Sequence, residues 1–197
     1  MGKSVLIMMA SYNGEKYIRK QLDSIIDQTY RNWNLIIQDD GSTDHTVEII
    51  EDYCNKDNRI SYIVNEEDKH GAFINFHLLI NHCKDMQPYD YYMFCDQDDI
   101  WSDNKIYRML NYADKRNVSP ILCYADMAII DGDDNVITDS LNSKWGLEKK
   151  NVESLFFSHK VFGCNTLINR ELFQLVPKVD INVHHVDILS HDNYYAK

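Results

Sequence analysis

The 197-residue chain is 44% hydrophobic and 26% charged, which is typical of a globular protein with one sizeable core. Its 31 acidic and 20 basic residues give a formal net charge of −11, which disfavours binding to nucleic acid or anionic lipid surfaces through bulk electrostatics. The five cysteines include no CxxC pair and no apolar run is long enough for a signal peptide or a membrane span, so we predict a cytoplasmic protein without a transmembrane segment.

The first half of the chain alternates between two apolar patterns. Continuous apolar runs are typical of strands covered on both faces, and they predict strands at residues 5–10, 35–37, 60–64 and 91–95. Apolar residues at helical spacing follow each run and predict helices within residues 14–28, 47–54, 73–83 and 106–113. Strand–helix units of this length imply right-handed parallel crossovers, so we predict an α/β fold with a doubly wound, mostly parallel sheet.

The alternation ends after Pro120. Residues 121–125 are predicted to form another strand, and the acidic turn at 131–135 leads into residues 136–137, which complete a hairpin. Further on, residues 151–158 are predicted to be helical, residues 163–168 to form a strand and residues 191–197 to begin a helix. The second half is therefore expected to be mixed, within the same domain.

Three polar loops follow predicted strands, at residues 11–13, 39–40 and 96–99. Ligands of doubly wound sheets bind beyond the carboxyl ends of the strands, so we expect the loops to converge on one crevice. The third loop has three carboxylates in four residues, which repel one another unless a cation neutralises them. Mg²⁺ and Mn²⁺ bind through such carboxylates together with substrate phosphates. The alternative for this loop is a solvated acidic turn or a helix N-cap.

Two common phosphate-binding motifs are missing from the chain. No GxGxxG follows the first predicted strand, which disfavours a Rossmann-type dinucleotide site, and the absence of GxxxxGK[ST] disfavours a P-loop. We therefore expect a metal ion on Asp96 and Asp98 to hold phosphate in place of a glycine-rich backbone loop.

The segments 9–15, 38–44 and 96–101 occur in order, each at the end of a predicted strand. Together they resemble the family 2 glycosyltransferases of the GT-A fold, and the last segment is most similar to the bacterial rhamnosyltransferase-like branch. The resemblance extends over residues 5–192. It implies one GT-A domain over residues 1–197, with a nucleotide-sugar half at about 1–117 and an acceptor half at about 118–197 whose C-terminal part is missing.

The resemblance also implies roles for residues of the first half. Ser11 and Tyr12 would border the nucleobase, and Asn13 and Glu15 would lie near the same site. Asp39 and Asp40 resemble the pair that reads base and ribose, whereas Asp98 corresponds to the metal-binding aspartate and Asp96 would contact ribose or metal. The alternatives are a half-buried aromatic for Tyr12, a helix charge for Glu15, a turn with a helix cap at residues 39–40, and a structural role for Trp101.

The second half carries a weaker resemblance. Gly163 lies in a segment similar to the acceptor-side strand, where a small residue lets substrate approach the backbone, and the alternative is an ordinary strand entry. Asp192 stands where the family carries its general base, and the alternative is a helix N-cap. The histidines at 184, 185 and 191 are further metal-ligand candidates, or surface residues.

The resemblance implies a metal-dependent, inverting glycosyltransferase with Mn²⁺ or Mg²⁺ as cofactor. The donor would be a UDP- or dTDP-sugar carrying glucose, galactose or rhamnose, and the acceptor a growing bacterial surface glycan, lipid-linked or on a glycoprotein. The enzyme would work at the inner face of the membrane, and an exposed sheet edge would favour a homo-oligomer. The alternatives are a non-catalytic sugar-nucleotide-binding or assembly domain of a larger transferase, a sugar-phosphate nucleotidyltransferase, and a structural α/β protein.

Overall fold

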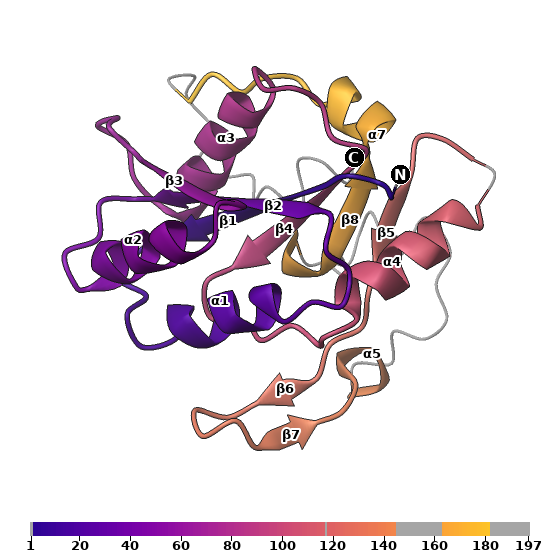
Figure 1. The fold of residues 1–197 in the computed structure, drawn as a ribbon, viewed down its shortest axis with the longest axis horizontal. Coiled ribbons are helices and arrows are strands. Elements are labelled where there is room, and N and C mark those ends of the chain that lie inside the picture. Colours follow the sequence, from indigo (N-terminus) through magenta and orange to yellow (C-terminus); the bar gives the residue numbers. More distant parts are fainter. Residues whose placement is uncertain (1, 117, 145–162, 182–197) are drawn as a thin grey trace.

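The computed structural model describes residues 2–116, 118–144 and 163–181. Its centre is a six-stranded sheet in the order β3-β2-β1-β4-β8-β5 (Figure 1). The strands are β1 (Val5–Ser11), β2 (Trp33–Asp39), β3 (Ile60–Val64), β4 (Tyr91–Asp96), β5 (Leu122–Tyr124) and β8 (Thr166–Asn169). Strands β1 to β4 pair in parallel, and β8 runs antiparallel to both β4 and β5. The predicted α/β fold with a mostly parallel sheet is confirmed.

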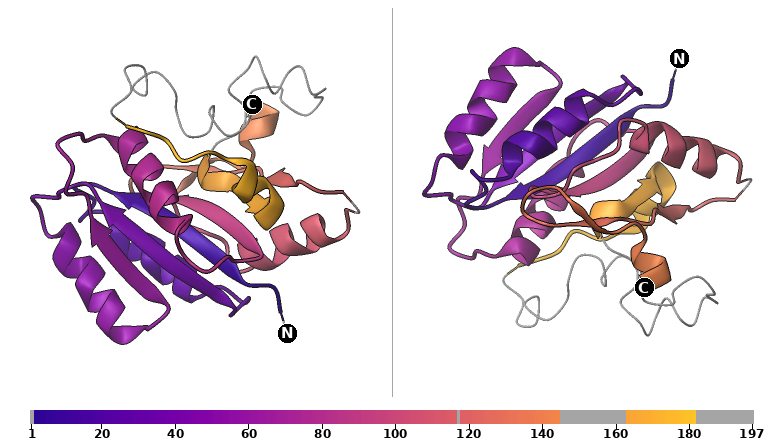
Figure 2. Two further views of the ribbon diagram at one scale, coloured as in Figure 1. Left: turned by 90° about the horizontal axis from the view of Figure 1, so that it is seen from above. Right: turned by 90° about the horizontal axis from the view of Figure 1, so that it is seen from below.

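Helices cover both faces of the sheet (Figure 2). One face packs against α1 (Ile18–Ile26), α2 (Thr46–Lys56) and α4 (Lys105–Asp114), and the other against α3 (Ala72–Cys83) and α7 (Arg170–Leu175). Successive residues of β1 point to opposite faces, so Ile7 joins one core and Leu6 the other. Every residue of β1 is buried, which explains its continuous apolar sequence.

Three predicted elements differ from the structure. Helix α1 begins at Ile18 rather than Gly14, because residues 14–17 form a turn in which the Gly14 carbonyl accepts from the amides of Tyr17 and Ile18 at 2.9 and 3.0 Å. The acidic turn does close a hairpin, but β7 (Val136–Thr138) pairs with β6 (Ile129–Ile130), while β5 pairs with β8. Residues Gly163–Asn165 form a 3-10 turn, η1, ahead of β8.

The predicted helices at 151–158 and 191–197 lie outside the described residues. A short helix, α5 (Leu141–Lys144), follows the hairpin. Within the described part of the chain, no helix combines the length and the apolar character needed to cross a membrane.

Candidate active site

The loops that follow β1, β2 and β4 meet at one edge of the sheet, because these three strands are neighbours and run parallel. In the register, Ser11 lies opposite Asp39, and Ala10 lies opposite Asp96. The expected convergence of the three polar loops is therefore a consequence of the topology.

A side chain of the β4 loop holds the β1 loop. The Gln97 amide accepts from the backbone N–H of Tyr12 at 3.0 Å through Oε1 and donates to the Tyr12 carbonyl at 2.9 Å through Nε2. Gly14 makes this contact possible, because a Cβ at that position would stand 2.1 Å from Gln97 Oε1. The Tyr12 ring itself takes no part, and the residue is 52% exposed.

A cavity of about 630 Å³, the small cavity, lies between these loops and the start of α3. The loops contribute Ser11, Tyr12, Asp40, Asp96, Gln97 and Asp98, and the α3 side contributes His70, Gly71, Asn75 and Phe76 among others. The residues on the α3 side were not among those predicted from the sequence. The combination of the half-buried Asp96 carboxylate, the exposed Asp98 carboxylate, an exposed tyrosine ring and apolar floor residues suits a ligand with both a flat ring and a charged group.

Asp39 does not line this cavity. Its carboxylate is fully buried and accepts from the hydroxyls of Ser11 and Ser42 at 2.9 and 2.6 Å, and from the amides of Gly41 and Ser42 at 3.1 and 2.7 Å. These four bonds use the acceptor capacity of an ionised carboxylate. Asp39 thus fixes the turn that follows β2.

Asp40 lies at the cavity wall and is also engaged. Its Oδ1 accepts from Asn65 Nδ2 at 2.6 Å and faces His70 Nδ1 at 3.2 Å, while Oδ2 accepts from the Gly71 amide at 2.6 Å. The Gly71 φ of 123° is a conformation that side chains rarely adopt, which explains a glycine here. Asp40 therefore fixes the loop between β3 and α3 against the cavity.

Asn13 and Glu15 lie behind the loops and do not line the cavity. Asn13 Oδ1 accepts from the Thr43 amide at 2.8 Å, and Glu15 Oε2 accepts from the His45 amide at 3.0 Å, just before α2. Asn13 has a φ of 45°, a left-handed conformation that asparagine tolerates. Both side chains tie the β1 loop to the β2 loop.

The acidic loop after β4 differs from the loop after β2 in the exposure and hydrogen bonding of its carboxylates. Asp98 is exposed, and within the described part of the chain its carboxylate accepts no hydrogen bond. Ligand atoms of Asp96, Asp99 and Cys164 all lie within 4.8 Å of one another, so the structure groups Asp96 with Asp99 and a thiol, and the sequence-predicted partner Asp98 is not in this group. Carboxylate oxygens are the ligands that Mg²⁺ and Mn²⁺ prefer, and the residues present therefore fit such an ion.

Lys105 supplies an internal positive charge next to this cluster. Its Nζ donates to the Cys164 carbonyl at 3.0 Å and to Asn165 Oδ1 at 2.9 Å, and lies 4.1 Å from the Trp101 ring centroid. Burial lowers the pKa of Lys105, against the raising effect of the nearby carboxylates. Burial likewise raises the pKa of Asp99, which the Cys164 thiol and the Lys105 charge oppose.

The remaining predicted residues are placed as follows. Trp101 is 4% exposed and belongs to the core, as its structural alternative predicted. Gly163 is buried at the start of η1, next to Cys164 and hence beside the acidic loop. Asp192 and the three histidines at 184, 185 and 191 lie outside the described residues.

Comparisons with known proteins point to one family. A sequence model described as "Glycosyl transferase family 2" matches residues 6–176. The chain is 34% identical over 190 residues to dTDP-rhamnosyl transferase RfbG of Shigella flexneri, covering 93% of the chain and 62% of that protein. It is 30% identical over 198 residues to UDP-Glc:alpha-D-GlcNAc-diphosphoundecaprenol beta-1,3-glucosyltransferase WfgD of Escherichia coli, covering 98% of the chain and 72% of that protein.

Two solved structures share the fold. S. aureus TarS 1-349 in complex with UDP-GlcNAc has a TM-score of 0.67 at 17% identity, over 87% of this chain and 46% of that one. Mannosyltransferase PcManGT from Pyrobaculum calidifontis, in complex with GDP-Man and Mn²⁺, has a TM-score of 0.67 at 14% identity, over 100% of this chain and 51% of that one. The predicted GT-A fold is confirmed. The chain spans 62% and 53% of the lengths of two curated relatives.

Proposed function

The chain belongs to glycosyltransferase family 2, and on this basis we propose that it carries out a metal-dependent, inverting transfer of a sugar from a nucleoside-diphosphate donor to a glycan hydroxyl. The observation that carries the proposal is the small cavity, which the loops after β1, β2 and β4 enclose with Asp96 and Asp98 on its lining. We take residues 1–197 as one GT-A domain, with a donor half at about 1–117 and an acceptor half at about 118–197.

The donor nucleotide would lie across the small cavity. The exposed Tyr12 ring offers a stacking face for the base, beside Ser11. Asp40 would read base and ribose from the opposite wall, where it already holds His70 and Gly71. The donor site would depend only indirectly on Asp39, Asn13 and Glu15, whose side chains hold the loops after β1 and β2 in place.

Asp96 and Asp98 would hold Mn²⁺ or Mg²⁺, and Asp99 offers a further carboxylate close to that of Asp96. When bound, the ion would neutralise negative charge on the diphosphate as the donor is cleaved. The chain itself provides Lys105 as a fixed cation behind the loop, which lowers the cost of gathering three carboxylates in one place.

The transfer step needs one base. The acceptor oxygen would form a bond to the anomeric carbon as the bond from that carbon to the diphosphate oxygen breaks, and the acceptor proton would pass to the base. Asp192 is our candidate for this base, and Gly163 our candidate for close approach of substrate to the backbone. A single displacement of this kind inverts the anomeric carbon.

The similarity to a dTDP-rhamnosyl transferase and to a UDP-Glc glucosyltransferase supports dTDP-rhamnose or UDP-glucose as donor, with UDP-galactose as a further candidate. The acceptor would be a lipid-linked or glycoprotein-borne bacterial glycan, and the enzyme would work at the cytoplasmic face of the membrane. These assignments rest on family likeness.

Calorimetric titration tests the proposal. UDP, dTDP and GDP are titrated into the protein with Mn²⁺ and again with EDTA. We expect one nucleotide to bind only with metal, and a donor-hydrolysis assay with the matching sugar nucleotide to show turnover. Metal-dependent binding without turnover would favour the non-catalytic binding domain. A folded protein that binds none of the three nucleotides would contradict the proposal.

A further inference from the structure

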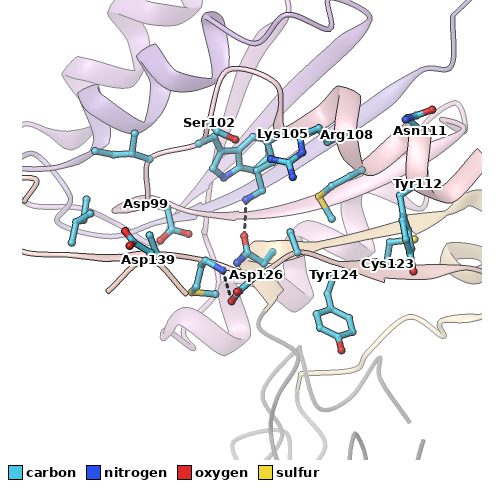
Figure 3. A pocket seen from close by; sticks show the side chains of 18 of the residues that line it. Asp99, Ser102, Lys105, Arg108, Asn111, Tyr112, Cys123, Tyr124, Asp126 and Asp139 are labelled. Carbon is cyan, nitrogen blue, oxygen red and sulfur yellow. Dashed lines mark hydrogen bonds between the residues drawn. The ribbon is translucent and has the colours of Figure 1, made fainter. Parts of the chain in front are cut away.

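The small cavity contains a buried oxygen atom that has no hydrogen-bond partner among the described residues, Oδ1 of Asn75. A larger cavity of about 960 Å³ lies along α4, next to Lys105 and Arg108 (Figure 3). The unpaired buried groups of that larger cavity, Trp101 Nε1 and Asn165 Nδ2, are both donors. Of the two cavities, only the small one presents an unpaired buried acceptor within the described part of the chain.

The orientation of the Asn75 side chain is fixed by its own amide nitrogen. Asn75 lies in the first turn of α3 and is 1% exposed. Its Nδ2 donates to the carbonyls of Ser11 and Gln38, at 3.2 and 2.8 Å, where β1 and β2 end. A flipped amide would place Oδ1 against these two acceptors, so the nitrogen stays turned to the strands. The oxygen is then the polar atom that this side chain offers to a ligand.

The two aspartates after β2 have much less acceptor capacity left. Asp39 lies outside the small cavity, and its carboxylate already accepts four hydrogen bonds. The Asp40 carboxylate has three partners, which occupy three of its roughly four acceptor positions. One remaining position on Asp40 suits a ribose hydroxyl, whereas the Asn75 oxygen has no competing donor.

An unpaired buried acceptor favours a ligand that brings a donor. Leaving such an oxygen without a partner costs free energy, and an N–H group of the ligand recovers that cost. On the base-pairing edge, uracil, thymine and guanine carry a ring N–H, whereas cytosine and adenine carry a ring nitrogen that accepts. A fixed acceptor therefore favours the first three bases and disfavours the other two.

We propose that Asn75 selects the base of the donor nucleotide, with its Oδ1 accepting the ring N–H of uracil, thymine or guanine and disfavouring cytosine and adenine. The proposal rests on the proposed function, because it concerns the donor of the same reaction. It moves recognition of the base from Asp40 to a residue of α3 and leaves the ribose to Asp40.

Calorimetric titration of the full chain with Mn²⁺ tests this assignment. The probes are UDP, dTDP, GDP, CDP and ADP, together with the tightest binder methylated at its ring N–H (3-methyl-UDP, 3-methyl-dTDP or 1-methyl-GDP). CDP matches UDP in size, so that comparison changes the hydrogen-bonding pattern alone. The methylated probe removes the donor from an otherwise identical nucleotide.

Two variants assign the discrimination to one side chain. Asn75→Ala removes the oxygen and leaves room for the added methyl group. The matched control is Gln38→Ala, because Gln38 Oε1 is also buried and unpaired within the described residues, yet Gln38 does not line the small cavity. The backbone carbonyl of Gln38 that accepts from Asn75 remains in this control.

We expect the wild type to bind its tightest nucleotide at least about 10-fold more strongly than CDP, ADP or the methylated form, since each leaves Oδ1 without a donor. Asn75→Ala should lose this preference and Gln38→Ala should keep it. A purely structural role of Asn75 would weaken all probes by the same factor and leave their ratios unchanged. Unchanged ratios in Asn75→Ala, or tight binding of the methylated form to the wild type, would overturn the proposal.

The wild-type titrations stand without either variant, so the proposal is tested even if Asn75→Ala does not fold. They also separate this inference from the proposed function. Nucleotide binding without discrimination between the methylated and unmethylated forms would overturn the role of Asn75 alone. Absence of binding by every nucleotide in the folded wild type would overturn the proposed function, and this inference with it.

Discussion

The loops after β2 and β4 are both acidic and lie at the same edge of the sheet, yet their carboxylates differ in burial and in hydrogen bonding. Asp39 is fully buried and accepts four hydrogen bonds, whereas Asp98 is exposed and accepts none within the described residues. The hydrogen-bonding capacity of the first carboxylate is used by the protein's own donors, whereas the second is open to solvent or to a ligand. The contrast separates residues that build the site from residues that bind its ligand.

The largest expected effect is a loss of stability on removal of the buried Asp39 carboxylate. Asp39→Ala leaves the amides of Gly41 and Ser42 without their acceptor, and charged hydrogen bonds contribute about 1.5–3 kcal/mol each. We expect the free energy of unfolding to fall by about 3 kcal/mol, measured by urea denaturation. Asp98→Ala is the matched control, with a change below about 0.5 kcal/mol. Equal losses in both variants would remove the distinction between the loops.

The reverse order is expected for ligand binding. Asp98→Asn should weaken metal-dependent nucleotide binding by about 100-fold, since even residues that only orient a metal ligand cost about 10- to 100-fold. The free energy of unfolding should change little. Asp103→Asn, an equal charge change on an exposed residue nearby, should leave nucleotide affinity unaltered. If Asp98→Asn binds nucleotide as the wild type does in calorimetry with Mn²⁺, the metal assignment fails.

A smaller effect on nucleotide affinity is expected from removing the Tyr12 ring, the proposed stacking face for the base. Tyr12→Ala should lower nucleotide affinity by about 10-fold, because stacking of a base on an aromatic ring is worth about 1–3 kcal/mol. Stability should not change, since Tyr12 contacts Gln97 through its backbone alone. Tyr12→Phe retains the ring and should retain the affinity. Loss of affinity in both variants would assign the effect to the hydroxyl instead.

An effect of similar size, on stability, is expected at the link between the loops. Gly14→Ala places a Cβ against Gln97 and should break its two hydrogen bonds to Tyr12, at a cost of about 1–2 kcal/mol in unfolding free energy. In a Gln97→Ala background the same substitution should cost less than about 0.5 kcal/mol, because no side chain is left to displace. Additive losses in this double-mutant cycle would show that the two positions are not coupled.

The strands and their order along the chain could be predicted, because buried parallel strands such as Val5–Ser11 are continuously apolar. The loop residues could also be predicted, since carboxylates cannot remain within such strands. What each aspartate does could not be predicted. Asp39 and Asp98 look alike in sequence, and what distinguishes them is the burial of Asp39 and the hydroxyl and amide donors that the fold places around it.

Contacts between segments that are distant in the chain could not be predicted from the sequence either. Lys105 donates hydrogen bonds to Cys164 and Asn165, about sixty residues away, and nothing in a lone lysine at the start of a helix signals a half-buried, hydrogen-bonded cation. His70 reaches the cavity only because Asp40 holds its loop. The partner strand of the hairpin, Ile129–Ile130, could not be predicted either, because two residues are too few for an alternating pattern to be recognised.

The most direct test is the anomalous signal of manganese in crystals grown with Mn²⁺ and the nucleotide that binds most tightly. We expect a manganese peak on the carboxylates of Asp96 or Asp98, with the base against Tyr12 and the diphosphate reaching from the small cavity to the metal. The carboxylate of Asp39 should keep its four hydrogen bonds. A nucleotide bound elsewhere, or a metal held by Asp39, would contradict the division between the two loops.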